Sequence, residues 1–166
     1  TYTFTLRDDV YFSDDRCVHP EARGKSVDDE NEKTRSDKAR GRKLTAKDME
    51  YSFKRLAALP DSGGFWVVEG KIVGLDAFRE SALKLKDQGE GKEKDSEWRA
   101  YFDKPVAGLK VLDERRLQVK LTEVYPQFLY AITLSYGAAV AREASDYYGD
   151  QLTRLPVGTG PFILDH

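Results

Sequence analysis

The clearest prediction of local structure comes from one segment: Leu44-Thr45-Ala46-Lys47-Asp48-Met49-Glu50-Tyr51-Ser52-Phe53-Lys54-Arg55-Leu56. Thr45 is a favourable helix N-cap, and Asp48 follows three residues later, where a capping box usually has Glu. Apolar residues then recur at spacings of three and four, which places them in one stripe along a helix: Ala46, Met49, Phe53 and Leu56. The segment therefore predicts a capped amphipathic helix that packs against other elements.

Strand patterns lie on both sides of this helix. Residues 1–6 alternate strictly, with aromatic or aliphatic side chains on one face and threonines on the other. Residues 106–112 and 115–121 have the pattern of two strands joined by a tight hairpin. We expect an antiparallel sheet that contains residues 2–6 and 117–121.

The sequence predicts further helices. One runs from Leu75 to Lys86, and its inner face is formed by Leu75, Phe78, Ala82 and Leu85. A third has Pro126 in its first turn, where the missing N–H does no harm, and runs to about Leu134. A short fourth helix covers Arg142 to Tyr148. The segment from Gln88 to Asp95, rich in Gly, Glu and Lys, is expected to be an exposed loop.

Charge is concentrated in residues 13–43, where both signs are interleaved and aromatic residues are few. This composition predicts a long, exposed, charged insertion. Over the whole chain, 27 Lys and Arg oppose 29 Asp and Glu, and the net charge of −2 argues against nucleic acid or an anionic membrane as partner. No stretch approaches the roughly 18 apolar residues of a membrane-spanning helix.

Few residues are available for catalysis. The two histidines are His19, inside the charged segment, and His166. His19 with Cys17, Asp14 and Asp15 resembles a Cys-His pair or a metal site, but a metal needs three or four ligands held at defined distances. We therefore predict no catalytic residue, no metal and no cofactor, and we interpret these residues as members of a charged loop.

Aromatic residues offer a better candidate for binding. Phe65 and Trp66 begin a short apolar segment directly after the turn Pro60-Asp61-Ser62-Gly63-Gly64. An apolar segment that emerges from a turn can line a cleft, so both are candidate ligand-binding residues. The alternative is that both belong to the core, where most large apolar side chains lie.

Several short motifs follow one another in a characteristic order: Tyr2-Thr3-Phe4-Thr5-Leu6-Arg7, Val10-Tyr11-Phe12-Ser13-Asp14-Asp15, Leu44-Thr45-Ala46-Lys47-Asp48, Gly108-Leu109-Lys110-Val111-Leu112-Asp113 and Pro156-Val157-Gly158-Thr159-Gly160-Pro161-Phe162. This order resembles the bacterial extracellular solute-binding proteins of family 5, which include dipeptide-, oligopeptide- and nickel-binding receptors of ABC importers. The motifs span nearly the whole chain.

The resemblance implies an α+β fold, with a mainly antiparallel sheet and three to four helices packed on it. Residues 1–166 are then a single domain, a partial first lobe of a two-lobed periplasmic-binding-protein fold, and both ends look cut from a longer chain. It also implies a peptide or other small solute as ligand, an ABC permease as partner, and a periplasmic or extracellular location. Membrane association would come through the permease or a lipid anchor, and the segment would be monomeric.

The chain departs from the family pattern at the insertion, because the family motif around Asp14 and Asp15 usually runs almost directly into the helix that starts at Thr45. Phe65 and Trp66 occupy the stretch nearest to a ligand-facing aromatic of the family. Three other readings stay open: a sensor domain of a regulator, a protein-interaction scaffold, and a small hydrolase that uses Cys17 and His19.

Overall fold

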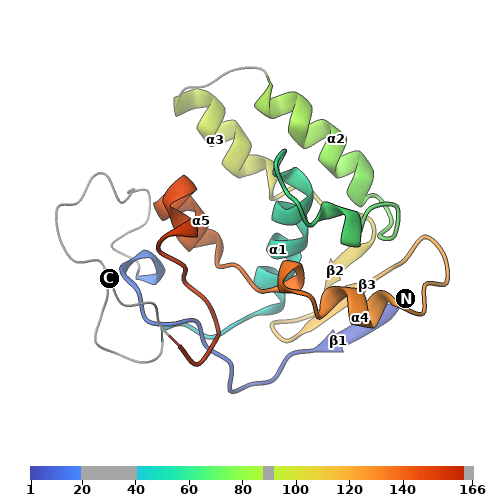
Figure 1. Ribbon diagram of the computed structural model, residues 1–166, viewed down its shortest axis with the longest axis horizontal. Helices are drawn as coiled ribbons and strands as arrows, with labels where there is room; N and C mark the ends of the chain where they lie inside the picture. The colour runs from blue at the N-terminus through green and yellow to red at the C-terminus, as the bar shows by residue number, and fades with distance from the viewer. Residues whose placement is uncertain (20–40, 88–91, 163–166) are drawn as a thin grey trace.

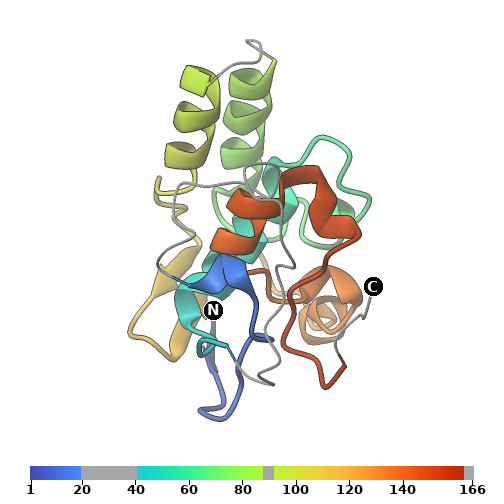
Figure 2. The same cartoon turned by 90° about the vertical axis from the view of Figure 1, so that its left-hand side faces the viewer.

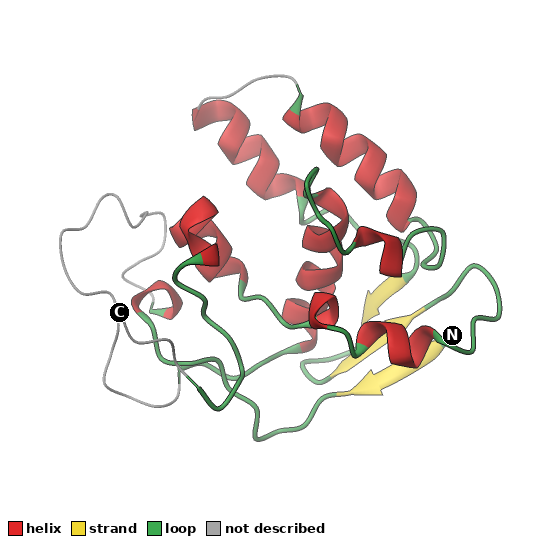
Figure 3. Cartoon of the chain, viewed as in Figure 1, coloured by secondary structure: helices red, strands yellow, loops and turns green. Residues whose placement is uncertain are grey.

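The computed structural model describes residues 1–19, 41–87 and 92–162, with residues 92–94 described by their backbone only (Figures 1 and 3). Its sheet has three antiparallel strands in the order β1-β3-β2: β1 (Tyr2–Thr5), β2 (Leu109–Val111) and β3 (Arg116–Val119). Leu117, in the central strand, lies opposite Phe4 on one side and Val111 on the other. The predicted antiparallel sheet and the α+β class are confirmed.

Helix α1 (Ala46–Ala58) packs on this sheet and forms the centre of the molecule. It starts as predicted, because the Thr45 N–H donates to Asp48 Oδ2 at 2.8 Å. The helix is buried on more than the predicted apolar stripe, since Lys54 also lies inside. Lys54 Nζ contacts the Glu50 carboxylate at 2.6 Å and donates to the Phe102 carbonyl at 3.0 Å, so the buried charge is paired.

The other predicted helices are present. Helices α2 (Leu75–Lys86) and α5 (Arg142–Tyr148) have the predicted bounds. Helix α4 is shorter than predicted: it covers Phe128–Ile132, and a separate 3-10 turn, η5 (Ser135–Gly137), follows it. The end of α4 and η5 pack tightly against each other, since a Cβ atom on Gly137 would lie 2.0 Å from the Ile132 carbonyl oxygen.

Helix α3 (Lys92–Tyr101) overturns the prediction of a loop that ends at Asp95. It lies beside α2, and the two extend together from the rest of the fold (Figure 2). Contacts from distant parts of the chain hold its end in place: the rings of Tyr101 and Phe78 are 4.7 Å apart, and the Tyr101 hydroxyl donates to the Phe78 carbonyl at 3.0 Å. Tertiary packing thus stabilises a helix whose first turn has a loop-like composition.

A second, smaller apolar cluster packs around helix α5 and the 3-10 turn η1 (Arg16–Val18): Phe12, Cys17, Leu44, Ala141, Ala144, Tyr147, Tyr148 and Val157. The start of the predicted insertion is therefore not exposed. Asp15 is buried, and its carboxylate is satisfied there by hydrogen bonds from the Cys17 N–H, at 3.0 Å, and from the Tyr148 hydroxyl, at 2.8 Å. Residues 20–40 of the predicted insertion lie outside the described residues.

Candidate functional site

A set of large apolar side chains is exposed on two segments that contact each other at Gly64. We call it the aromatic face, and its members are Trp66, Leu129, Tyr130, Leu134 and Tyr136. Trp66 belongs to the 3-10 turn η4 (Phe65–Val67), and the others lie on or next to α4 and η5. Exposed apolar groups of this kind commonly mark binding surfaces.

Gly64 is where the two segments meet. A Cβ atom at this position would lie 2.1 Å from Cδ1 of Tyr136, so the tyrosine ring lies directly over the glycine backbone. Trp66 follows two residues later. The absence of a side chain at Gly64 thus allows η4 and η5 to lie against each other (Figure 1).

The two predicted ligand-binding residues, Phe65 and Trp66, have different surroundings. Phe65 is 5% exposed and belongs to the main core, where the Arg79 guanidinium lies 4.4 Å from the centre of its ring. Trp66 is 64% exposed. Of the predicted pair, Trp66 is the residue that a ligand can reach, whereas Phe65 anchors the turn that presents it.

Cys17 and His19, the pair behind the hydrolase reading, are not arranged for nucleophilic catalysis. Burial raises the pKa of the Cys17 thiol, and the neighbouring Asp15 raises it further, so the thiolate is disfavoured. His19 Nε2 lies 3.0 Å from Asp14 Oδ1, and no hydrogen bond joins His19 to Cys17 in the described part of the chain. Within the same ranges, no group of three or more His, Cys, Asp or Glu is placed to hold a metal ion.

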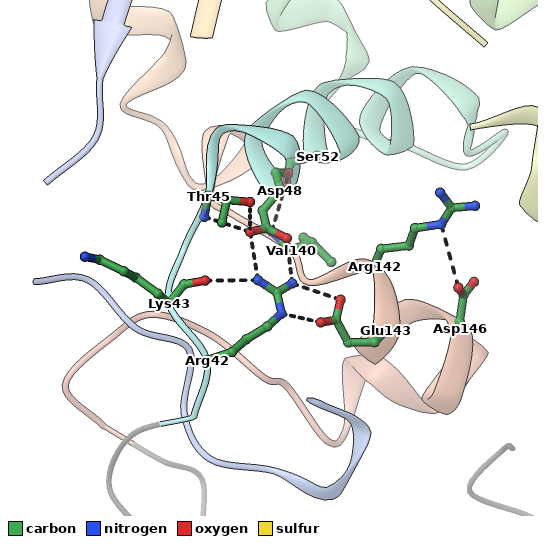
Figure 4. Close-up of polar contacts among 9 residues, drawn as sticks. All are labelled: Arg42, Lys43, Thr45, Asp48, Ser52, Val140, Arg142, Glu143 and Asp146. Atoms are coloured by element: carbon green, nitrogen blue, oxygen red, sulfur yellow. Dashed lines mark hydrogen bonds and ion pairs between the residues drawn. The ribbon is translucent and has the colours of Figure 1, made fainter. Parts of the chain in front are cut away.

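A cluster of charged and polar side chains at the start of α1 holds two helices together (Figure 4). Arg42 donates to Asp48 Oδ1 at 2.6 Å and to Oδ2 at 2.9 Å, and it also pairs with Glu143 in the first turn of α5. Burial opposes the charge of Arg42, but these two carboxylates raise its pKa above the ordinary value. Because each carboxylate is held by the guanidinium, this cluster ties α5 to α1.

The order of motifs noted in the sequence agrees with the comparison to protein families. The model for Bacterial extracellular solute-binding proteins, family 5 Middle, matches residues 1–166. This chain belongs to that family. No curated protein matches the chain. Members of the family are extracellular receptors that bind solutes and, in general, do not transform them.

Family membership and the antiparallel sheet both agree with the resemblance that the sequence motifs indicated. Within the ranges that the structure covers, no helix is both long enough and apolar enough to cross a membrane. Sequence reasoning missed Tyr130 and Tyr136, the other two aromatic side chains of the aromatic face. Tyr130 lies in the predicted third helix and Tyr136 lies just beyond its predicted end at Leu134, in the separate turn η5, and nothing local in the sequence indicates that either ring is exposed.

Proposed function

We propose that this segment works in a receptor that captures peptides for an ABC importer and performs no chemistry on them. Family membership supports the capture of a solute. Residues 1–166 would form one domain, part of the first of two lobes that close around the ligand. The receptor would act outside the cytoplasmic membrane, as a monomer, and pass its ligand to a permease, with the permease or a lipid anchor keeping it near the membrane.

The observation that carries the peptide assignment is the exposure of Trp66 on the aromatic face. Trp and Tyr rings bind apolar side chains over a large area and keep a polar group for hydrogen bonding. A metal ion as the ligand would instead need His, Cys or carboxylate side chains. The aromatic face presents Trp, Tyr and Leu side chains, which suit an organic ligand with apolar side chains.

Calorimetric titration of the complete receptor would test this proposal. The probes are the tripeptide Ala-Phe-Ala and, in a separate titration, Ni²⁺. We expect the peptide to bind and Trp66→Ala to weaken its binding by roughly tenfold, as for an aromatic residue at the centre of an interface. Leu112→Ala is the control, because it removes an exposed apolar side chain outside the aromatic face.

Three results would count against the proposal. Binding of Ni²⁺ without binding of the peptide would exclude the peptide assignment. Equal peptide affinity in Trp66→Ala and the unchanged receptor would exclude Trp66 from the ligand-facing surface. A loss of the same size in Leu112→Ala would show that the effect of Trp66→Ala is not specific to the aromatic face.

A further inference from the structure

A cavity of about 390 Å³ is lined by residues of α1, α2, α3 and α5. In the ribbon view, α3 and α5 lie on the side of α1 away from η4 (Figure 1). The volume of the cavity falls within the range of roughly 300–1,000 Å³ that is usual for small-molecule sites. Residues that lie in its wall include Tyr51, Arg55, Trp98, Phe102, Ser145 and Asp146. The cavity does not include Trp66, so it is separate from the aromatic face.

One wall of the cavity is aromatic. The rings of Tyr51 and Phe102 are 5.1 Å apart, and those of Trp98 and Phe102 are 5.3 Å apart and nearly perpendicular. Tyr51 and Phe102 are buried, whereas Trp98 is only half-buried. Together these rings form an apolar surface on which an aromatic or aliphatic group can pack.

The cavity is also lined by Arg55, which lies one helical turn after Tyr51 on α1 and lacks a charged partner among the described residues. Arg55 donates from Nε to the Ser145 hydroxyl at 3.2 Å, and no ion pair of Arg55 occurs in the described part of the chain. The nearby carboxylate of Asp146 is already shared by two other cations, with Arg99 at 3.6 Å and Arg142 at 3.8 Å. Among the described residues, the two terminal amino groups of Arg55 therefore remain available as donors.

A guanidinium with two free amino groups is suited to a carboxylate, which it binds through two parallel hydrogen bonds. We propose that this cavity is a second binding site, for a small carboxylate with an aromatic or apolar body, in which Arg55 binds the carboxylate and Trp98 contacts the body. The site goes beyond the proposed capture of peptides, because it uses neither the aromatic face nor the closure of two lobes.

The ligand itself supplies the first test. Calorimetry on the complete receptor compares 3-phenylpropionate with 3-phenylpropionamide, which has the same shape without the charge. We expect the acid to bind at least roughly tenfold more tightly than the amide, the usual difference for a charge-assisted hydrogen bond. Propionate, which lacks the ring, should bind more weakly than 3-phenylpropionate. Equal binding of acid and amide, or no binding of the acid at millimolar concentration, would overturn the proposal.

Two variants locate the binding. Arg55→Gln should lower the affinity for 3-phenylpropionate roughly tenfold and leave the affinity for 3-phenylpropionamide unchanged. The control Arg116→Gln removes an exposed arginine that pairs with Asp113 on the β2–β3 hairpin, and it should leave both affinities unchanged. If Arg55→Gln does not fold, the comparison of acid with amide still decides. Unchanged binding of the acid in folded Arg55→Gln would exclude Arg55 as its partner.

Trp66→Ala separates this site from the peptide site. It should leave the affinity for 3-phenylpropionate unchanged, because Trp66 lies outside the cavity. Loss of 3-phenylpropionate binding in Trp66→Ala would place the ligand on the aromatic face and overturn the second site. Failure of Ala-Phe-Ala to bind would instead contradict only the proposed function.

Discussion

Arg42→Gln is expected to destabilise the protein by about 3 to 5 kcal/mol, because it leaves the carboxylate of Asp48 buried without a cation. Asp48 is only 5% exposed, and Arg42 contacts both of its oxygens at 2.6 and 2.9 Å. The Thr45 N–H and hydroxyl still donate to Asp48, each at 2.8 Å, which favours the lower end of that range. The loss of the partly exposed ion pair between Arg42 and Glu143 adds about 1 kcal/mol or less to this destabilisation.

The free energy of unfolding is measured by urea denaturation, with an unchanged slope as the sign that only stability has changed. Arg7→Gln is the matched control. Arg7 contacts Asp9 through two atoms, at 2.9 and 2.6 Å, but these side chains are 78% and 58% exposed. Removing this exposed pair should therefore change the free energy of unfolding little or not at all.

A second substitution separates charge from geometry. Arg42→Lys keeps the positive charge but loses the planar fork that contacts Asp48 and Glu143 together, so its loss of stability should be intermediate. If Arg42→Gln costs no more than Arg7→Gln, water rather than Arg42 stabilises the Asp48 carboxylate. That result would refute both the burial of an ion pair at the start of α1 and its role in holding α5 against α1.

Three further results are expected. Lys54→Met should cost about 3 kcal/mol in the same denaturation experiment, because it leaves a carboxylate of α1 without its cation, and an unchanged midpoint would contradict this. A thiol reagent should modify Cys17 only after unfolding, since the thiol is buried and its pKa is raised. Rapid labelling of the native protein would contradict the burial of this thiol. Gly64→Ala should displace Tyr136 and weaken peptide binding, whereas Gly63→Ala, whose Cβ meets nothing within 4 Å, should not.

Much of the fold follows from local signals in the sequence. The capping box at Thr45 gives the start of α1, and the apolar spacing gives the bounds of α2. Each of these signals acts within one or two helical turns, so the rest of the fold is not needed to interpret it. Strict alternation in residues 2–5 likewise predicts β1, and its pairing with β3 follows from the antiparallel pattern.

Features that depend on distant contacts could not be predicted in this way. Asp15 is buried because of a hydroxyl 133 residues further along, on Tyr148, and no local pattern in a charged segment indicates such a partner. Helix α3 depends on packing against α2. Its aromatic residues Trp98 and Tyr101 have helical spacing, which is a signal that the charged residues before them obscured.

The candidate site shows the same limit. Sequence reasoning selected Phe65 and Trp66 together, because neighbouring aromatic residues after a turn are equivalent in a sequence. In a 3-10 turn, neighbouring side chains point in different directions, so one enters the core while the other reaches solvent. The packing of Phe65 in the core, with Arg79 of α2 over its ring, shows which residue lies inside.

The roles of Arg42 and of the cavity are connected through α5. Arg42 holds Glu143 of α5 against α1, and Ser145 and Asp146 of the same helix lie in the wall of the cavity. Arg42→Gln should therefore weaken 3-phenylpropionate binding at temperatures where the protein is still folded. Binding of Ala-Phe-Ala should change little, since η4 lies on the other side of α1 (Figure 1). Equal losses for both ligands would mean that the substitution loosens the whole domain, and that α5 has no separate connection to the cavity.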